Sequence, residues 1–586
     1  MKQLINRNTF WCSVFVEKLS KLGIKYVCIS PGSRSTPLTL AFASSNKFIV
    51  YPIVDERSSA FFALGIAKKT NSPVAIVTTS GTAVAELYPA IIEAYFQRIP
   101  LIVCTADRPH YLQKSGANQT INQNNIFINH IRYFANIGMP SLNQKKIKKL
   151  IDVTFAAVST ALQTDKGPVH LNFPFEKPFE PDVPTDTLNK DFIKSFKYYF
   201  PKPPSQLNDN NKEISFVSKK ISEKRKGIIF CGYNKYSTDF ADLILRLSNK
   251  IGFPIWADGS SGLRFSNSTF HENYNVLIKS KKFLQLLDPE FIIQFGGAPT
   301  SNAMLEFYKS TKAEKIIVNM FGDRNDPSLT AKKIIKMNPD DFCKKINTMI
   351  NDKNNSLWFE ELKALNTLAE KSKQGFLRNV PFNFEGKIID EVVKVCPPKS
   401  NLVISNSLPI RDADYFVSSN SKKINLFTNR GASGIDGINS TALGIAAVSK
   451  KPTILVTGDL AFFHDLTGFY NSVKFSIPLI IILINNHGGG IFESLPIARF
   501  GKIFKEYFQT DLKLDNKKLV KAYGAYYNKV RNLTQFKNEI KLSLNRKSLS
   551  VIEVFTDAKE SKLLREKYWH LGVKSIENYI DALKHK

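Results

Sequence analysis

Short, fully apolar runs alternate along the chain with longer segments in which apolar residues recur every three or four positions. In the N-terminal part, the runs YVCIS, PVAIVTTSG and PLIVCTADRP end at Gly, Ser or Asp, and helix-like segments separate them. Apolar runs bounded by such residues are typical of strands buried on both faces. Their alternation with helical segments predicts βαβ units and a parallel sheet.

The same alternation occurs twice more along the chain. GIIFCGY, FPIWADGSSGL, FIIQFGGAPTS and KIIVNMFGDRNDP form a second series, and NLVISNS, KINLFTNRGASG, PTILVTGDLAFFHD, IPLIIILINNHGGG and SVIEVFTD form a third. The Pro-rich stretches FPFEKPFEPDVPTDTL and YYFPKPPSQLNDNNKE indicate a linker after the first series, and a Lys/Asn-rich helical segment precedes the third. We therefore predict an α/β protein with three doubly wound parallel-sheet domains in a row, at residues 1–185, 205–355 and 380–586.

Length and composition agree with this organisation. A chain of 586 residues is too long for a single core, and 43% hydrophobic residues with a mean hydropathy of −0.17 are ordinary for a globular protein. No run approaches the roughly 18 consecutive apolar residues of a membrane helix. The N-terminal stretch MKQLINRNTFWCSVFVEKLS predicts an amphipathic helix and not a signal peptide. Six scattered cysteines without a CxxC pair argue against zinc and disulfides, so we expect a cytoplasmic protein without a membrane span.

The formal net charge of +30 does not by itself indicate a nucleic-acid partner. Lys and Arg number 81 against 51 acidic residues, but the lysines are spread through helical stretches such as NQKKIKKL. The sequence has no basic tail, aromatic RNA-binding motif or zinc-finger spacing. We therefore interpret the charge as a solvated surface and expect no nucleic-acid partner. A positive field that attracts small anionic substrates is the alternative.

Two strand ends in the third series carry residues suited to a cation and a phosphate. Asp459 follows the run TILVTG, and Asn486 follows the run LIIILIN 27 residues later. Adjacent parallel strands would bring both to the same edge of the sheet. Carboxylate, amide and backbone carbonyl oxygens suit Mg²⁺ that also binds phosphate, and glycines allow a diphosphate to approach the main chain. Taken alone, the two segments could also be ordinary turns.

The pair GDL…NNHGG resembles the diphosphate-binding motif of thiamine diphosphate enzymes, and further motifs narrow the resemblance. They are SPGSRSTPLTLAF (30–42), DERSSAFFALGIAK (55–68), TSGTAVAELYPAIIEA (79–94), TADRPHYL (105–112), GANQTINQ (116–123), NSLPIRD (406–412) and NRGASGIDGINSTALG (429–444). In this order they resemble the 2-succinyl-5-enolpyruvyl-6-hydroxy-3-cyclohexene-1-carboxylate synthase family of menaquinone biosynthesis. Leu460, where other thiamine diphosphate enzymes usually have Gly, also matches this family.

The resemblance implies a pyrimidine-binding N-terminal domain, a central domain without a catalytic role, and a diphosphate-binding C-terminal domain. It implies thiamine diphosphate and Mg²⁺, or Mn²⁺ in its place, as cofactors. The active sites would lie at subunit interfaces of a homodimer or homotetramer. The expected reaction decarboxylates 2-oxoglutarate and adds the succinyl carbanion equivalent to isochorismate. Alternatives are another thiamine diphosphate-dependent 2-oxoacid decarboxylase or carboligase, and a catalytically silent relative.

The resemblance also implies roles for residues at the cofactor. Glu56 in DERSS matches the glutamate that shares a proton with the aminopyrimidine ring; in isolation it could be a surface carboxylate beside Arg57. Asp459, Asn486 and the Gly488 carbonyl match the metal ligands. Ile435 matches the apolar wedge that bends the cofactor. Further expected cofactor contacts are Ser407, Asp436, Gly458, Leu460, Gly489 and Ile491.

Both substrates carry two carboxylates, for which bidentate guanidinium groups are the expected partners. Four arginines lie inside the matched motifs, at predicted strand ends: Arg34, Arg108, Arg411 and Arg430. Any one alone could be a surface or capping residue, but together they predict a basic pocket, which argues against smaller apolar substrates. Ser33, Asn118, Gln119 and Ser407 are expected to add hydrogen bonds, and Phe492 and Leu495 an apolar wall. Gln119 is the candidate to orient the substrate or a proton-transfer water.

Two features depart from the family pattern or stay open. Asn302 and Ala303 follow GGAPTS, where the family often has a basic residue or pair, so either another lysine supplies that charge or isochorismate is held by fewer contacts. His487 lies between Asn486 and the glycines, where many family members have Asn. We interpret it as a structural or hydrogen-bonding residue and not as a base. Arg324 is left without a role.

Overall fold

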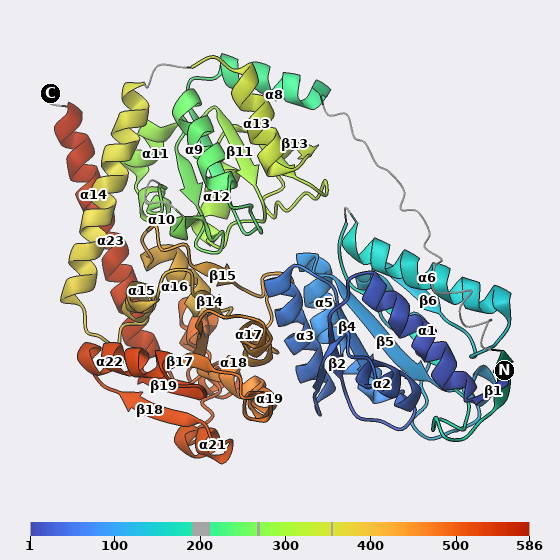
Figure 1. Cartoon of the computed structure of the whole chain (residues 1–586). Helices are drawn as coiled ribbons and strands as arrows, with labels where there is room; N and C mark the ends of the chain where they lie inside the picture. Colours follow the sequence, from blue (N-terminus) through green and yellow to red (C-terminus); the bar gives the residue numbers. More distant parts are fainter. Residues whose placement is uncertain (1, 164, 190–210, 267–269, 353–355, 585–586) are drawn as a thin grey trace.

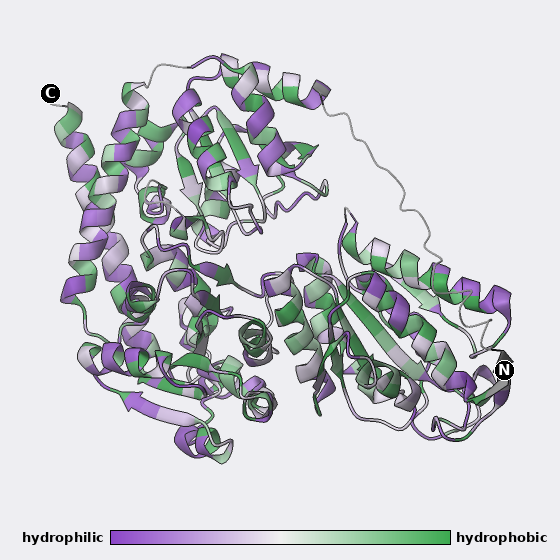
Figure 2. Ribbon diagram, viewed as in Figure 1, coloured by the Kyte–Doolittle hydropathy of each residue, from purple (hydrophilic) through white to green (hydrophobic). Residues whose placement is uncertain are grey.

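The protein has three units, and a parallel sheet lies at the centre of each (Figure 1). The computed structural model describes residues 2–163, 165–189, 211–266, 270–352 and 356–584; most of the predicted linker, residues 190–210, lies outside them. The strands are mostly hydrophobic, whereas the helices that cover them carry both polar and apolar residues (Figure 2). The predicted α/β class with three parallel sheets is confirmed. The exact domain limits stay a prediction.

The first sheet has the strand order β3-β2-β4-β5-β7-β6, and all neighbouring strands are parallel. Its strands are β2 (Tyr26–Ile29), β3 (Ile49–Pro52), β4 (Val74–Thr78), β5 (Leu101–Asp107), β6 (Tyr133–Asn136) and β7 (Val169–Pro174). Its helices are α1 (Arg7–Lys21), α2 (Thr36–Ala43), α3 (Glu56–Thr70), α4 (Thr82–Ala85), α5 (Tyr88–Gln97) and α6 (Gln144–Leu162). Helices α1, α2 and α6 cover one face and α3 and α5 the other.

The third sheet repeats this topology with the order β15-β14-β16-β17-β19-β18. Its strands are β14 (Asn401–Ile404), β15 (Asn425–Phe427), β16 (Thr453–Gly458), β17 (Leu479–Asn485), β18 (Tyr526–Val530) and β19 (Leu549–Phe555). Its helices include α15 (Glu385–Val395), α16 (Leu408–Phe416), α17 (Ile438–Ala447), α18 (Asp459–His464), α19 (Phe469–Phe475), α21 (Asn516–Ala522) and α22 (Leu533–Leu544). Both sheets therefore reverse their strand order at equivalent points, between β2 and β4 and between β14 and β16. Ligands of doubly wound sheets bind beyond the strand ends at such points.

The middle sheet has the order β10-β9-β11-β12-β13 and is also parallel. Its strands are β9 (Gly227–Cys231), β10 (Ile255–Ala257), β11 (Phe291–Phe295), β12 (Glu314–Asn319) and β13 (Ala331–Lys336). Its helices are α8 (Asn211–Glu223), α9 (Phe240–Ile251), α10 (Tyr274–Leu277), α11 (Lys281–Leu287), α12 (Asn302–Ser310) and α13 (Pro339–Met349). The long helices α14 (Leu357–Asn379) and α23 (Ala558–Lys584) run side by side and share a hydrophobic cluster with this sheet (Figure 1). The C-terminal helix thus joins the middle and third units.

Helices α3 and α17 pack closely and join the first and third units. A Cβ atom on Gly65 would lie 2.1 Å from the Thr441 carbonyl oxygen, and one on Gly444 would lie 2.0 Å from the Phe62 carbonyl oxygen. Side chains at these positions would push the helices apart. The cluster around this contact contains residues of both sheets, so the two units share one hydrophobic core.

Two local elements differ from the sequence pattern. The helical segment AVAELYPAIIEAYFQ (83–97) forms parts of two helices, α4 and α5, because Pro89, the second residue of α5, has no backbone N–H to donate to the preceding turn. The predicted N-terminal helix begins only at Arg7. Before it, β1 (Lys2–Ile5) pairs antiparallel with β8 (Asp186–Asn189), a partner that local periodicity cannot reveal.

Candidate active site

Two of the predicted arginines lie together beyond the ends of β2 and β5. Arg34 donates from Nη1 to the Phe175 carbonyl oxygen at 2.7 Å, and its guanidinium lies 4.8 Å from the centre of the Phe179 ring. Burial, together with the positive charge of Arg108, lowers the pKa of Arg34. Asp107 lies beside the pair and accepts a hydrogen bond from the Asn172 amide at 2.8 Å. The two cations outnumber this carboxylate, so the site attracts an anion.

The loop that carries Asn118 and Gln119 is bound to the same strand ends through Ser80. The Ser80 hydroxyl donates to the Gln119 carbonyl oxygen at 3.0 Å and accepts a hydrogen bond from Arg108 Nη1. Gln119 has a φ of +57°, and its side chain is exposed, as are those of Asn118 and Ser33. Ser80 belongs to the motif TSGTAV, but its position between two predicted site residues was not foreseen.

The other two predicted arginines form a second pair, in the third unit. Arg411 donates to the Ser407 carbonyl oxygen at 2.7 Å, and Arg430 donates to Asn406 Oδ1 at 3.3 Å. Burial is the main cause that lowers the pKa of Arg411, and the charge of Arg430 adds to it. Ser407, with a φ of +72°, is the last residue before α16. The four arginines therefore lie as two pairs, one on each of the two equivalent sheets.

The loop 428–436, which carries Arg430 and Ile435, is held by two buried charges of the first unit. Lys68 on α3 donates to the Thr428 carbonyl oxygen and to Asn429 Oδ1, both at 2.6 Å. Glu93 on α5 accepts hydrogen bonds from the backbone N–H groups of residues 431 and 432 at 2.8 and 2.7 Å. Ile435 at the end of this loop is 36% exposed. Neither Lys68 nor Glu93 was predicted to act here.

Glu56 is the first residue of α3 and is partly buried. Burial raises the pKa of its carboxyl group. Its neighbours bind the segment that follows Asp459: Arg57 donates to the His464 carbonyl oxygen at 3.0 Å, and Asp55 accepts from the Thr467 hydroxyl at 2.7 Å. The start of α3 is therefore attached to the third unit.

Asp459 and the glycine loop meet beyond the ends of β16 and β17, as the parallel pairing predicts. Asp459 accepts hydrogen bonds from the backbone N–H of Leu460 at 2.9 Å and from that of Gly488 at 2.7 Å. Burial raises the pKa of Asp459 to about 6. Asn486 Oδ1 is buried and has no hydrogen-bond partner among the residues that the structure describes. A buried carboxylate beside an unpaired amide oxygen fits a divalent cation with oxygen ligands.

The glycines at 488 and 489 are required because the segment 505–509 of the same chain packs directly against their backbone. Gly488 has a φ of +123°, and a Cβ atom on it would lie 1.8 Å from the Gln509 carbonyl oxygen. A Cβ atom on Gly489 would lie 2.2 Å from the Phe508 carbonyl oxygen. By contrast, a Cβ atom on Gly458 would meet nothing within 4 Å, which leaves space beside the Asp459 backbone. The segment 505–509 thus covers one side of the loop.

The remaining predicted contacts lie around this loop. Phe492 packs against Phe508 with ring centres 5.7 Å apart, and Leu495 is 50% exposed. Ile491 and Asp436 are partly buried. These positions agree with an apolar wall at the loop, but their roles stay predictions.

Two buried carboxylates and an arginine that were not predicted are linked to the loop 486–490 through the Asn486 side chain. Asn486 Nδ2 donates to Glu385 Oε1 at 2.8 Å, and the other Glu385 oxygen accepts from Arg565 of α23. Arg565 also donates to Asp412 at 2.7 and 2.6 Å. On the same helix as Asp412, Asp414 pairs with the buried Arg264 of the middle unit at 2.8 Å. Helix α16, which carries Arg411, is therefore fixed from two sides.

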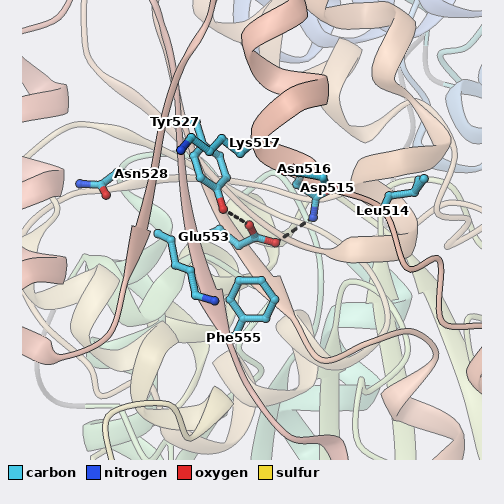
Figure 3. Close-up of a pocket in the computed structure, with 9 residues that line it drawn as sticks. Leu514, Asp515, Asn516, Lys517, Tyr527, Asn528, Glu553 and Phe555 are labelled. Carbon is cyan, nitrogen blue, oxygen red and sulfur yellow. Dashed lines mark hydrogen bonds between the residues drawn. The ribbon is translucent and has the colours of Figure 1, made fainter.

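A cavity of about 480 Å³ lies between the start of α21, the edge strand β18 and its neighbour β19 (Figure 3). The carboxylate of Glu553 accepts hydrogen bonds there from Tyr527 and, at 2.8 Å, from Asn516 (Figure 3). Phe555 also lines the cavity, and its ring lies 5.7 Å from that of His487, whose Nδ1 is 3.5 Å from Asp511. None of the predicted site residues lines this cavity.

The unassigned residues of the middle unit lie on its helices and loops. Asn302 is the exposed first residue of α12, and Ala303 packs partly against the hydrophobic cluster beneath that helix. Arg324 donates to the Ala331 carbonyl oxygen at 3.3 Å, within its own loop. The structure thus gives Arg324 a local structural contact.

Comparisons with known proteins agree with the three-sheet architecture. Residues 12–126 match the N-terminal thiamine pyrophosphate-binding domain of thiamine pyrophosphate enzymes, 205–404 their middle domain, and 416–554 their C-terminal thiamine pyrophosphate-binding domain. A relative from Bacillus cytotoxicus, named 2-succinyl-5-enolpyruvyl-6-hydroxy-3-cyclohexene-1-carboxylate synthase, is 36% identical over 99% of this chain and 100% of its own length. The chain belongs to this synthase family.

Other comparisons extend the result. A synthase of the same name from Oceanobacillus iheyensis is 35% identical over 97% of this chain and 98% of its own length. Among solved structures, benzoylformate decarboxylase from Polynucleobacter necessarius matches with a TM-score of 0.67, covering 94% of this chain and 98% of its own; at 16% identity this shows the shared fold alone. Within the described residues of this synthase-family chain, no helix is both long and apolar enough to cross a membrane.

Proposed function

We propose that this chain catalyses the thiamine diphosphate- and Mg²⁺-dependent decarboxylation of 2-oxoglutarate and the addition of the succinyl group to isochorismate. The products are 2-succinyl-5-enolpyruvyl-6-hydroxy-3-cyclohexene-1-carboxylate and CO₂, in menaquinone biosynthesis. The observation that carries the proposal is the 36% identity to a named synthase over 99% of the chain. The presence of Glu56, Asp459, Asn486 and both arginine pairs supports it against a catalytically silent relative.

The third unit would hold the diphosphate end of the cofactor and its cation. Asp459, the free Oδ1 of Asn486 and the Gly488 carbonyl oxygen are the proposed ligands of Mg²⁺, or of Mn²⁺ in its place. When bound, thiamine diphosphate supplies the stabilised carbanion chemistry that no side chain can provide. Ile435 would support the cofactor from its apolar side. Proposed further contacts are Ser407, Asp436, Gly458, Leu460, Gly489 and Ile491.

Glu56 is proposed as the proton-exchanging residue at the aminopyrimidine ring. Burial raises the pKa of its carboxyl group, which increases the fraction that carries a proton at a given pH. A protonated carboxylic acid can donate to a ring nitrogen and take the proton back in the same site. The attachment of residues 55 and 57 to the third unit supports a fixed position for this group.

The two arginine pairs are proposed to bind the carboxylates of the two substrates. Each guanidinium can form two parallel hydrogen bonds with a carboxylate, and the neighbouring cation strengthens the attraction. Ser33, Asn118 and Gln119 would add polar contacts near Arg34 and Arg108. Phe492 and Leu495 would exclude water from the reacting carbon.

We also propose a homodimer or homotetramer with sites at subunit interfaces, located in the cytoplasm, and the domain division at 1–185, 205–355 and 380–586. Large apolar side chains on α18 and α19 support a subunit contact, since Phe463, Tyr470 and Val473 are 43%, 47% and 50% exposed. Sedimentation analysis of the purified protein would test the assembly.

The deciding experiment follows 2-oxoglutarate consumption and adduct formation with thiamine diphosphate and Mg²⁺, with and without isochorismate. We expect turnover to require isochorismate and to fall by about 10²–10⁴-fold in Glu56→Gln, as for loss of a proton-transfer group. The control is Asp182→Asn, which removes an exposed carboxylate of the same unit. Equal consumption of 2-oxoglutarate without isochorismate would identify a plain decarboxylase. Failure to bind thiamine diphosphate would exclude the proposed function.

A further inference from the structure

The two consecutive asparagines after β17 each bind a different buried glutamate. Asn485 Nδ2 donates to Glu553 Oε1 at 2.7 Å, and Asn486 Nδ2 donates to Glu385 Oε1 at 2.8 Å. The two glutamates are both 1% exposed, and they lie on β19 and at the start of α15. The two amides thus have equivalent partners on their nitrogen atoms.

The oxygen atoms of the two amides have different surroundings. Asn485 Oδ1 accepts a hydrogen bond from the His487 backbone N–H at 3.1 Å, so this side chain closes the turn. Asn486 Oδ1 is buried without a partner in the described part of the chain. A buried polar atom that is left unpaired in the same loop whose Gly488 N–H binds Asp459 is available for a ligand.

Glu385 determines which end of the Asn486 amide faces the loop. The oxygen and nitrogen ends of an amide have almost the same shape, so only hydrogen-bond partners distinguish them. A carboxylate accepts hydrogen bonds and cannot donate them, and therefore it selects the NH₂ end. The Thr556 hydroxyl also donates to Glu385 Oε1 at 3.2 Å, and Arg565 donates to the other oxygen.

We propose that Glu385 is a positioning residue that turns the Asn486 amide so that its oxygen is presented to the divalent cation. The inference rests on the proposed function, which places the cation at Asp459 and Asn486. Arg565 of the C-terminal helix α23 binds the other oxygen of Glu385 and so helps to hold Glu385 in this orientation. Glu385 itself does not touch the cation or the substrates.

Replacing Glu385 by Gln separates this role from mere packing. Arg565 can only donate hydrogen bonds, so it attracts the oxygen of the introduced glutamine and leaves the glutamine NH₂ facing position 486. The Asn486 amide then turns over to accept from that NH₂. Its own NH₂ now faces the cation, and one ligand is lost.

A second substitution restores an oxygen atom that faces the cation. In the double variant Glu385→Gln/Asn486→Asp, the introduced aspartate has oxygen atoms at both ends. It accepts from the introduced glutamine with one oxygen and presents the other to the cation. The net charge of the pair is the same as in the natural protein, so electrostatic changes at a distance are small.

The test titrates Mg²⁺ into the full-length protein at fixed thiamine diphosphate and follows cofactor binding by calorimetry. We expect Glu385→Gln to raise the Mg²⁺ concentration for half-maximal binding about 10–100-fold, as for other residues that orient a metal ligand. The double variant should return to within about threefold of the natural protein. The control is Glu553→Gln, which removes the buried carboxylate that binds Asn485. Because the Tyr527 hydroxyl can accept as well as donate, the introduced glutamine can keep its oxygen towards Asn485, and the midpoint should shift by no more than about threefold.

Each result has a defined meaning. An unchanged midpoint in Glu385→Gln would overturn the positioning role. Equal loss in Glu385→Gln, the double variant and Glu553→Gln, together with a lowered melting temperature, would also overturn it, because it would show a structural role only. If the natural protein binds no cofactor at any Mg²⁺ concentration, the proposed function itself fails.

Discussion

Glu93→Gln should weaken the attachment of the loop 428–436 to the first unit. The carboxylate of Glu93 is 3% exposed and accepts from the backbone N–H groups of residues 431 and 432 at 2.8 and 2.7 Å. Glutamine retains one acceptor but turns an NH₂ group towards the second backbone donor. The variant therefore loses one charge-assisted hydrogen bond and leaves one partly buried N–H group unpaired.

The size of the effect follows from these contacts. A hydrogen bond to a charged group contributes about 1.5–3 kcal/mol, and an unpaired donor costs about 1–3 kcal/mol when fully buried and less where water reaches it, as at this loop. Part of this loss is offset because the neutral side chain is easier to bury. We expect the free energy of unfolding to fall by about 2–3 kcal/mol. For a cooperative unit of 150–250 residues, this lowers the melting temperature by about 4–12 °C.

Differential scanning calorimetry and steady-state kinetics would measure the two consequences. Because the loop carries Arg430, we expect a higher KM for the dicarboxylate substrates in addition to the lower melting temperature. Glu306→Gln serves as the control, since its side chain is 70% exposed and the change should cost no more than about 0.5 kcal/mol. A Glu93→Gln protein that melts and binds substrate like this control would refute the reasoning.

Three further predictions follow from buried positions. Gly488→Ala should abolish Mg²⁺-dependent cofactor binding in calorimetry, because its Cβ atom would lie 1.8 Å from the Gln509 carbonyl oxygen; normal binding would contradict this. Gly444→Ala, 2.0 Å from the Phe62 carbonyl oxygen, should lower the melting temperature by separating α3 from α17. Burial lowers the pKa of His170 to about 3, so the folded protein keeps this side chain neutral where the unfolded chain takes up a proton. The free energy of unfolding should therefore fall by up to about 1.4 kcal/mol per pH unit as the pH drops from 6.5 to 3. Urea titrations of His170→Gln should lack this slope.

Much of the fold follows from local sequence because parallel sheets have simple rules. Strands buried on both faces appear as continuous apolar runs, and their ends carry the turn residues. Since parallel strands all point the same way, residues after each run gather at one edge. This is why Asp459 and the glycine loop could be placed together, and why two arginine pairs formed from four separate motifs.

Contacts between distant segments could not be predicted in this way. Glu385 lies 101 positions from Asn486 and 180 from Arg565, and no periodicity or spacing relates them. The local pattern also does not distinguish Lys68 and Glu93 from residues of surface helices, whereas packing buries both against the loop 428–436. The break between α4 and α5, in contrast, has a local cause in Pro89.

The sequence alone determined the fold class, the residues at the strand ends and the family. The first two depend on patterns within one strand–loop–helix unit, and the family depends on the order of motifs along the chain. Only the tertiary structure decided which end of the Asn486 amide is free and which charges hold the loop 428–436 that carries Arg430. It also decided how α23 is linked to Asn486 through Arg565 and Glu385. These depend on groups brought together from several units, where a buried polar atom must find its partner or remain available for a ligand.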